Sequence, residues 1–359
     1  MDYGGASATC TAASGAFTCP FTAAVLAASN SGSGVSDSSS PGVTVTANVD
    51  DGAGNSATQA STSVTQDTAD PTMTITSGTV SSGATTTTAA IALTFTSNEA
   101  TSNFVAGDIT VSGCSLGSLT GSSTTVYTAT CTASSDGTPS ISVAAGGYTD
   151  TAGNGNTVSN TYTWTYDTTG PTMAITSATV VSGASTATAA IALTFTSSEA
   201  TTDFVQTDID ESGCSLSGSL GATNSKVYTD TCTATSDGTP TVSVAAGAFS
   251  DALSNTNSVS NTYTWTYDTT VPTIGITSVA GDDYVNEDEY DTNGFDVVGS
   301  VSGANGQTVT VDYGGASATC TAASGAFTCT FATSVLAAAN SGSGVEDNSD
   351  PGVTVTANV

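Results

Sequence analysis

Apolar and polar residues alternate along much of the chain with a period of two. Residues 91–95 place Ile, Leu and Phe at every second position, and residues 162–166 place Tyr, Trp and Tyr in the same way between threonines. This alternation, in segments rich in β-branched and aromatic residues, predicts half-buried antiparallel strands. Clusters of Gly, Asn, Asp and Ser, for example at 81–84 and 150–156, predict the turns between them.

A helical pattern is almost absent. The best candidates for a short helix or turn are residues 21–30 and their near copy at 331–340. About seven short strands per 100 residues is typical of an immunoglobulin-like β-sandwich. We therefore predict an all-β chain of tandem immunoglobulin-like β-sandwich domains in a linear array.

Internal repeats define the domain organisation. Residues 2–19 recur without change at 312–329, which is an offset of 310 residues. Two shorter segments also recur, 88–97 at 188–197 and 158–169 at 259–270. The prolines Pro71, Pro171 and Pro272, each followed by Thr, mark units of 100 and 101 residues, so the third unit has 109. Tandem units this similar are typical of extended arrays.

The repeats predict four segments. Residues 1–70 are the C-terminal part of a 109-residue unit, 71–170 and 171–271 are complete domains, and 272–359 are the N-terminal part of a second copy of the 109-residue unit. We expect the chain to be a stretch of a longer array. Its expected partners are further copies of the same repeats, in one long chain or in end-to-end or lateral assembly.

Charge excludes several classes of function. The chain has 31 acidic side chains, one lysine (Lys226), no histidine and a formal charge of −30. One cation cannot neutralise a row of phosphates, so we expect no nucleic-acid partner, and no basic segment is present to contact an anionic membrane. Histidine-based catalysis and histidine metal sites are impossible. The remaining oxygen ligands suit a hard cation, above all calcium.

The eight cysteines occur as one local pair in each unit. Each pair lies on adjacent predicted strands, and in residues 10–19 a turn separates the two strands, which makes a bridge geometrically natural. A soft-metal site or a redox motif needs a different grouping. We predict structural disulfides and therefore an oxidising compartment. The predicted pairs are Cys10–Cys19, Cys114–Cys131, Cys214–Cys232 and Cys320–Cys329.

Strand direction predicts where acidic loops meet. If the strand after Pro71 runs away from the preceding linker, the next strand returns and places Glu99 beside that linker, which contains Asp67. The loop before the last strand, with Asp150 and Asn154, should lie at the same pole. The next linker repeats the set with Asp167, Glu199, Asp251 and Asn255, and Asp268 opens the third.

Two further acidic loops belong to the 109-residue unit. Asp282, Asp283 and Glu287 lie in one of them, and Asp50 and Asp51 lie in the other. Clustered carboxylates repel one another when no basic side chain is near, and calcium accepts six to eight oxygens of the kind these loops supply. The alternative is that the loops are solvated and keep the protein soluble.

At these residues the chain resembles the bacterial immunoglobulin-like repeats of giant surface adhesins and biofilm-associated proteins. The segments that carry the resemblance are 167–172, 150–154 and 280–311. The resemblance implies arrays in which calcium at domain junctions stiffens a stalk. By this analogy the calcium ligands include Asp67, Glu99, Asp150, Asp167, Glu199, Asp251, Asp268, Asp282, Asp283 and Glu287. Paired cysteines and the near-absence of lysine depart from that pattern.

Three functions remain open at this point. The first is a structural, non-enzymatic stalk or fibre, secreted or anchored at a bacterial or archaeal cell surface, stiffened by calcium and disulfides. The second is a carbohydrate- or ice-binding adhesin module, in which Trp164 and Trp265 stack on sugars or threonine-rich faces order water. The third is a hydrolase with paired carboxylates, for which the acidic loop 282–289 is dense enough in carboxylates to be considered.

Overall fold

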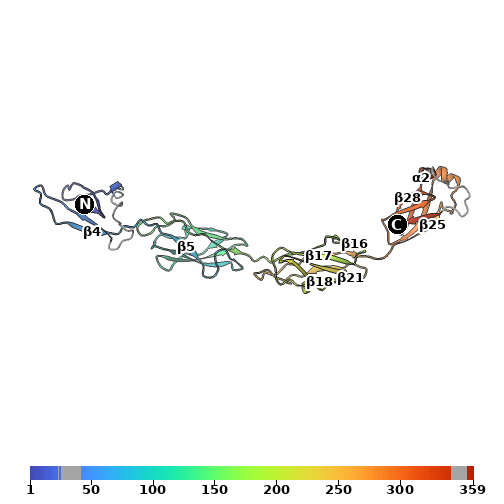
Figure 1. Cartoon of the computed structure of the whole chain (residues 1–359), viewed down its shortest axis with the longest axis horizontal. Coiled ribbons are helices and arrows are strands. Elements are labelled where there is room, and N and C mark those ends of the chain that lie inside the picture. Colours follow the sequence, from blue (N-terminus) through green and yellow to red (C-terminus); the bar gives the residue numbers. More distant parts are fainter. Residues whose placement is uncertain (23, 26–41, 341–353) are drawn as a thin grey trace. The chain divides into compact units, whose positions relative to one another are not determined.

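A computed structural model describes residues 1–22, 24–25, 42–340 and 354–359, and nearly all of their regular structure is strand (Figure 1). The predicted all-β fold is confirmed. Of the two helix candidates, residues 331–340 contain a helix, α2 (Thr333–Asn340). Most of residues 21–30 lie outside the described part of the chain.

Residues 71–170 form two sheets around one core. One sheet has the order β10-β11-β7-β5, with β9 also paired to β11, and the other has the order β13-β12-β8. A short parallel pair, β6 and β14, completes the domain. Its elements are β5 (Met73–Thr76), β6 (Thr85–Thr86), β7 (Ala90–Ser97), the 3₁₀ helix η1 (Ala106–Asp108), β8 (Ile109–Ser112), β9 (Cys114–Leu116), β10 (Thr120–Gly121), β11 (Val126–Ala133), β12 (Ser140–Val143), β13 (Tyr162–Thr163) and β14 (Thr165–Tyr166).

The core of this domain contains the alternating apolar residues that the sequence predicted to be buried. Ile91, Leu93 and Phe95 are buried on β7, while the residues between them point outward. Ile141 on β12 of the facing sheet joins the same buried cluster, as does Trp164. Because both sheets contribute one apolar face to a shared core, the domain is a β-sandwich.

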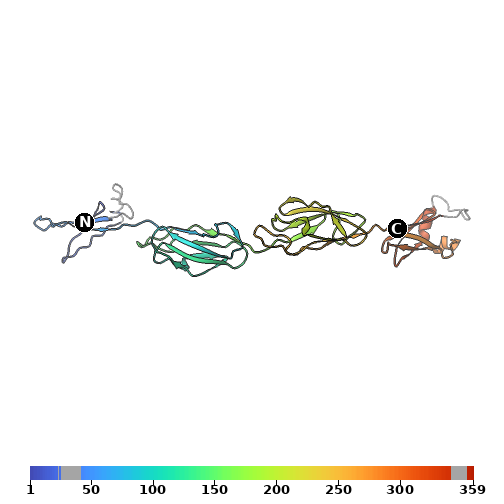
Figure 2. The same cartoon turned by 90° about the horizontal axis from the view of Figure 1, so that it is seen from below.

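Residues 171–271 repeat this architecture (Figure 2). The sheets have the orders β15-β17-β21-β19, with β20 also paired to β21, and β18-β22-β23. The elements are β15 (Met173–Thr176), β16 (Ser185–Thr186), β17 (Ala190–Ser197), η2 (Gln206–Asp208), β18 (Ile209–Ser212), β19 (Cys214–Leu216), β20 (Gly221–Asn224), β21 (Val227–Ala234), β22 (Thr241–Val244), β23 (Tyr263–Thr264) and β24 (Thr266–Tyr267).

The segments on either side of these domains are also built from strands. The N-terminal segment has one sheet with the order β2-β1-β3-β4, from β1 (Asp2–Tyr3), β2 (Ala6–Ser7), β3 (Val43–Ala47) and β4 (Ala60–Val64). The C-terminal segment has two sheets, β25-β26-β29 and β28-β27-β30, around one core. Its elements are β25 (Thr273–Val279), the π-helical turn η3 (Glu289–Asn293), β26 (Phe295–Ser302), β27 (Thr308–Tyr313), β28 (Ala316–Thr321), β29 (Ala326–Phe331), α2 and β30 (Val355–Asn358).

All four predicted cysteine pairs are bonded. Cys114 on β9 and Cys131 on β11 lie diagonally across two paired strands, with their Cα atoms 5.8 Å apart. Cys320 and Cys329 differ from the expected cross-strand bridge. They lie on β28 and β29, which belong to different sheets, so this disulfide joins the two layers of the sandwich. The turn between them redirects the chain into the second sheet, a change that the spacing does not reveal.

Removal of the buried disulfide of residues 71–170 should destabilise this domain selectively. We expect the double variant Cys114→Ala/Cys131→Ala to lose about 3 kcal/mol of unfolding free energy, because the bond closes a short loop in the unfolded chain. Urea unfolding followed by Trp164 fluorescence, in a Trp265→Phe background, measures the change. The matched variant Cys214→Ala/Cys232→Ala should leave this transition in place, and an equal shift in both variants would contradict the assignment.

Candidate metal centre

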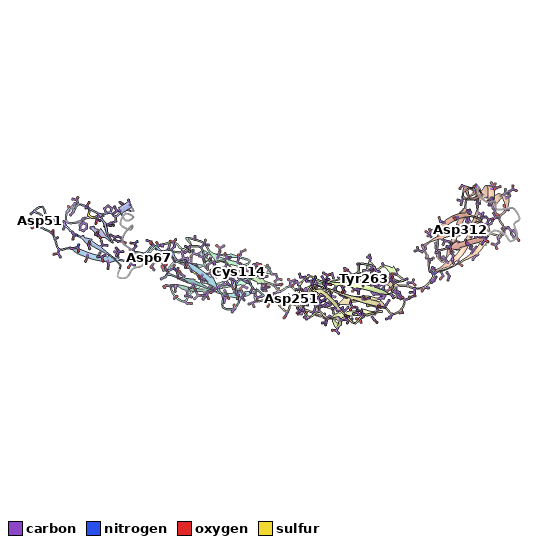
Figure 3. All side chains as sticks on the ribbon, in the orientation of Figure 1. Asp51, Asp67, Cys114, Asp251, Tyr263 and Asp312 are labelled. Carbon is purple, nitrogen blue, oxygen red and sulfur yellow. A yellow bond between two sulfur atoms is a disulfide. The ribbon has the colours of Figure 1, made fainter. Side chains whose placement is uncertain are left out.

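Three loops bring carboxylates together at one end of the domain that follows Pro71. Asp67 lies in the linker before β5, which we call the entering linker (residues 67–70); Glu99 follows the end of β7, and Asp150 lies in the loop before β13. One oxygen from each carboxylate lies within 4.8 Å of the others. Asp150 is buried, while Asp67 and Glu99 are half-buried. The structure thus places these three predicted residues in one cluster, and Figure 3 labels Asp67 in the entering linker.

The Asp150 carboxylate is held by its own loop. Its Oδ1 accepts hydrogen bonds from the backbone N–H groups of Ala152, Gly153 and Asn154 at 2.8, 2.7 and 2.9 Å. Its Oδ2 accepts one from Asn154 Nδ2 at 2.9 Å. Burial acts to raise the pKa of Asp150, but the hydrogen bonds from Asn154, Gly153 and Ala152 outweigh it and hold the pKa below 3.8. The carboxylate is therefore ionised and aimed before any ligand arrives.

Asn154 ties this loop to the entering linker. Its Nδ2 donates both to Asp150 Oδ2 and to the backbone carbonyl oxygen of Asp67, the latter at 3.1 Å. An amide nitrogen is a donor and cannot bind a cation. The amide nitrogen of Asn154 thus links Asp67 and Asp150, and the predicted ligand role of its amide oxygen stays a prediction.

Glu99 is placed by the end of β7. The Glu99 N–H donates to Ser97 Oγ at 3.4 Å, and Asn98 Nδ2 donates to Glu99 Oε1 at 3.1 Å. Asn98 is itself joined to the residue before β5, because its N–H donates to the Thr72 carbonyl and its Oδ1 accepts from the Thr72 N–H. The register of β5 against β7 therefore sets the position of Glu99 relative to the entering linker.

The geometry suits calcium. Calcium binds oxygens at about 2.3–2.6 Å, so oxygens on opposite sides of one ion are about 4.6–5.2 Å apart. Three carboxylate oxygens within 4.8 Å of one another can therefore reach one such ion. Zinc prefers nitrogen and sulfur ligands, which the three residues lack.

The same three residue types recur in the stretch 167–267. The equivalent residues are Asp167, Glu199 and Asp251. Asp251 accepts from the Leu253 and Asn255 N–H groups, and Asn255 Nδ2 donates to Asp251 Oδ2 and, at 3.4 Å, to the Asp167 carbonyl. Asn255, like Asn154, therefore acts as a positioning residue.

One difference distinguishes the second set. The sole lysine of the chain, Lys226, donates through Nζ to the Ser198 carbonyl at 2.8 Å, next to Glu199. Thr125 takes the corresponding place in the first domain. The Thr125 carbonyl accepts a hydrogen bond from the Ser97 N–H, and the Lys226 carbonyl accepts the equivalent bond from the Ser197 N–H. A positive charge near the second set opposes cation binding, so the cluster of Asp67, Glu99 and Asp150 is the stronger candidate.

The other predicted ligands do not join such a group within the described residues. Asp51 forms the same turn as Asp150, accepting from Ala53, Asn55 and the Asn55 side chain, at a loop tip labelled in Figure 3. Those hydrogen bonds, that of the Asn55 side chain foremost, lower the pKa of Asp51. The remaining members are Asp50, Asp268, Asp282, Asp283 and Glu287.

Local backbone contacts occupy several of those remaining carboxylates. Asp268 Oδ1 accepts from the Thr270 N–H, Asp282 Oδ1 from the Tyr284 N–H and Asp283 Oδ1 from the Val279 N–H. Such contacts shape turns and need no ion. Dense acidic sequence alone therefore did not identify a cluster, because each side chain is directed by its own turn.

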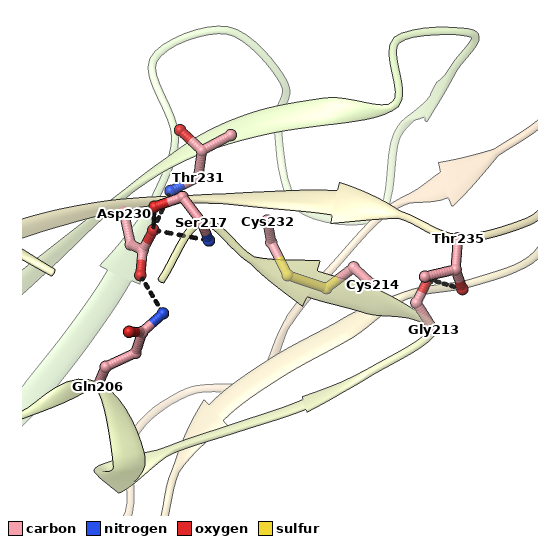
Figure 4. Close-up of a disulfide and its surroundings, with 8 residues drawn as sticks. All are labelled: Gln206, Gly213, Cys214, Ser217, Asp230, Thr231, Cys232 and Thr235. Carbon is pink, nitrogen blue, oxygen red and sulfur yellow. Dashed lines mark hydrogen bonds between the residues drawn. A yellow bond between two sulfur atoms is a disulfide. The ribbon is translucent and has the colours of Figure 1, made fainter. Parts of the chain in front are cut away.

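A buried carboxylate escaped the sequence reasoning. Asp230 on β21 is only 6% exposed and accepts hydrogen bonds from Gln206 Nε2 at 3.1 Å, the Thr231 N–H at 2.7 Å, and both the N–H and Oγ of Ser217 (Figure 4). The first domain has Ala129, Ala106 and Gly117 at these positions. All three positions differ together between the two repeats, and this concerted difference is the sequence feature that could have indicated the network. The network satisfies a buried charge beside the Cys214–Cys232 disulfide.

The two tryptophans are core residues. Trp164 and Trp265 are both 0% exposed and belong to the apolar clusters of their domains. Sugar stacking needs an exposed ring face, so the predicted alternative of carbohydrate binding through these residues is wrong. Each ring instead packs beside a tyrosine of the preceding strand, Tyr162 and Tyr263 respectively.

Comparison with known proteins identifies the class of domain. Residues 67–166 and 167–267 match the family profile of the bacterial Ig-like domain, one copy after the other. These stretches cover more than half of the chain, and the protein belongs to this family. Both family matches begin at a linker aspartate, Asp67 or Asp167, so the entering linker is part of the domain unit. No curated protein matches the sequence.

Several solved structures of bacterial adhesins are similar to the chain at a low level. The Escherichia coli adhesin FdeC is 10% identical, with a TM-score of 0.36, over 74% of this chain and 98% of its own. InvD of Yersinia pseudotuberculosis is 16% identical, with a TM-score of 0.31, over 74% and 84%. A 1.5-MDa bacterial ice-binding adhesin is 21% identical, with a TM-score of 0.29, over 75% and 88%. At such scores these likenesses carry no argument about function.

Proposed function

We propose that this chain is a non-enzymatic structural segment of a secreted or surface-anchored protein, a stalk of bacterial Ig-like repeats. In this proposal a calcium ion binds Asp67, Glu99 and Asp150 and orders the entering linker against its domain. The observation that carries the proposal is the convergence of a linker carboxylate with two domain carboxylates within 4.8 Å.

The position of Asp67 gives the ion a mechanical role. Asp67 is held through its backbone carbonyl by Asn154, but its carboxylate faces two others of the same charge. Without a cation, repulsion favours movement of the entering linker away from the domain. With calcium, the same carboxylate becomes an attachment point, so the ion converts a repulsive contact into an ordering one.

The electrostatics favour a ligand over a catalyst. The lowered pKa of Asp150 keeps its carboxylate ionised at neutral pH, as a cation ligand requires. A glycosidase-type general acid instead needs a raised pKa. The cluster therefore supports a binding role.

The disulfides bear on the location of the protein. Four disulfides are typical of an oxidising environment outside the cytoplasm, which supports a secreted or surface location. Within the described residues, no helix is long and apolar enough to cross a membrane.

Calcium addition to the metal-free protein tests the proposal. We expect calorimetric titration to show binding with a dissociation constant of about 10⁻⁴–10⁻³ M or tighter, the range of extracellular calcium modules. Binding to the folded state alone should raise the unfolding free energy by about 2.7 kcal/mol at a hundredfold excess over that constant. Hydrogen exchange of the 67–70 amides should slow at the same time.

Two controls accompany this titration. Magnesium at equal concentration should bind more weakly because it demands near-ideal octahedral geometry and gives up its water ligands reluctantly, and a chelator should reverse the calcium effect. Absence of binding heat together with unchanged exchange at 67–70 would refute the proposed role of calcium.

A further inference from the structure

Asp230 is a buried carboxylate that contacts a hydroxyl group and a carboxamide at the same time. It lies on β21 and is only 6% exposed. Its Oδ1 accepts from Oγ of Ser217, the residue after β19, and its Oδ2 accepts at 3.1 Å from Nε2 of Gln206, the first residue of η2. Figure 4 shows both contacts on this one carboxylate. A nucleophile, a base and an acyl group with a nitrogen leaving group therefore meet at one place.

The backbone and a disulfide hold this arrangement in place. The N–H groups of Ser217 and Thr231 donate to Asp230 Oδ1 at 3.2 and 2.7 Å. The Cys214–Cys232 disulfide joins β19, which precedes Ser217, to β21, which carries Asp230. The position of the hydroxyl relative to the carboxylate is thus set by two covalently joined strands, and such preorientation lowers the entropic cost of a reaction.

The fold does not require these three side chains. Residues 71–170 have Ala106, Gly117 and Ala129 at the equivalent positions, although the two domains share the same core positions and the same disulfide. Burying a carboxylate costs free energy even when hydrogen bonds satisfy it, and the first domain avoids this cost with three small residues. A chemical use of the carboxylate accounts for the concerted difference between the domains.

We propose that Ser217 and Gln206 form an intramolecular ester cross-link, with Asp230 as the acid–base group. Rotation about the side-chain bonds of Gln206 turns its Cδ toward Ser217 Oγ. Asp230 accepts the hydroxyl proton while Oγ attacks Cδ. The same carboxyl group then donates this proton to Nε2, the Cδ–Nε2 bond breaks, ammonia leaves and Asp230 is regenerated. One C–O bond replaces one C–N bond, so the reaction needs no oxidant, cofactor or second substrate.

The cross-link joins the two layers of this β-sandwich. Gln206 lies in η2, which leads into β18 of one sheet, whereas Ser217 follows β19 of the other sheet. The Cys214–Cys232 disulfide connects two strands of a single sheet. The ester therefore adds a covalent restraint between the sheets that the disulfide does not provide.

Intact-mass spectrometry of the full chain, reduced and denatured, tests the proposal. We expect a mass below that of the sequence by one ammonia molecule, because only one of the two complete domains has the three groups. A protease that cleaves before aspartate separates residues 203–207 from residues 210–229 in an unlinked chain. The cross-link should keep these two peptides together, and hydroxylamine, which cleaves esters, should release them.

Four variants assign the chemistry to its residues. Ser217→Ala removes the nucleophile and Gln206→Ala removes the acyl group, so each variant should have its full sequence mass. Asp230→Asn should also have its full mass, and a cross-link in that variant would overturn the acid–base role of Asp230. The matched control Ser215→Ala changes an exposed serine of β19 and should keep the ammonia loss.

Two results would overturn the cross-link itself. One is a wild-type chain with its full sequence mass, and the other is an ammonia loss that persists in Ser217→Ala. Neither measurement involves calcium, so failure of this inference leaves the proposed function unaffected.

Discussion

The Asp150→Asn variant should bind calcium at the Asp67 cluster at least about a hundredfold more weakly than the wild type, because it removes one of three ligand charges. Asparagine is nearly the same size as aspartate, so the loop keeps its volume. In the variant, however, the side-chain nitrogen of the new asparagine faces Asn154 Nδ2, the donor that bonds to Asp150 Oδ2 in the wild type. Two donors in contact repel, and the link from Asn154 to the entering linker should loosen as well.

A variant with the same charge change provides the control. Asp70 lies in the same entering linker, is exposed, and does not belong to the cluster. Asp70→Asn therefore alters net charge and linker composition equally but should leave calcium affinity nearly unchanged. Equal losses in the two variants would show that bulk charge, and not the cluster, governs binding.

The pH dependence of the metal-free domain follows from the same hydrogen bonds. Since the pKa of Asp150 is lowered in the folded state, its ionised form stabilises the fold at pH values above 3.8. This contribution is lost as the pH falls through the lower folded value. Asp150→Asn should remove that part of the acid sensitivity, which acid titration followed by circular dichroism would detect.

The second large effect is expected in the core. Trp164→Ala should cost about 3–5 kcal/mol of unfolding free energy, the usual loss when a large buried aromatic side chain is truncated. Trp164 is 0% exposed and packs beside Tyr162, with ring centroids 6.1 Å apart. Because whole domains are stable by only about 5–15 kcal/mol, this loss would leave the domain near unfolding.

Trp164→Phe separates volume from hydrogen bonding. The Trp164 Nε1 has no hydrogen-bond partner among the described residues, so phenylalanine sacrifices no such bond. We expect this variant to be clearly more stable than Trp164→Ala, because it retains an aromatic ring in the core. Urea unfolding, followed by the loss of near-ultraviolet signal, reports the domain of residues 71–170 in both variants. Trp265 is present in both variants and reports the other domain as an internal reference. Equal stability of the two variants would contradict a packing role.

Much of the candidate site could be predicted from strand direction alone. The alternating segments 73–76 and 91–95 run antiparallel, so the residues after one must lie near the residues before the other. That rule places Glu99 beside Asp67 without any knowledge of side-chain contacts. It does not distinguish a ligand from a positioning residue, so the ligand role of Asn154 stays a prediction.

Acidic density was a weaker guide than strand direction. The loop with Asp282, Asp283 and Glu287 has the densest charge, yet the described structure groups none of these residues into a three-carboxylate cluster. Asp136 stands in an ordinary turn sequence, and nothing in its spacing indicated that it meets Thr168 and Thr169. Such contacts depend on where the turn lies relative to a strand that follows much later in the chain.

The alternation, repeats and cysteine spacing by themselves determined the sandwich fold, the tandem order and the paired disulfides, because these features depend on local periodicity and chain proximity. Only the tertiary structure decided that both tryptophans are buried, that Cys320–Cys329 joins two sheets, and which carboxylates face one another. Those outcomes depend on how two sheets pack and on the path of individual turns. The orientation of a single side chain is set by its contacts with residues that are distant in the sequence.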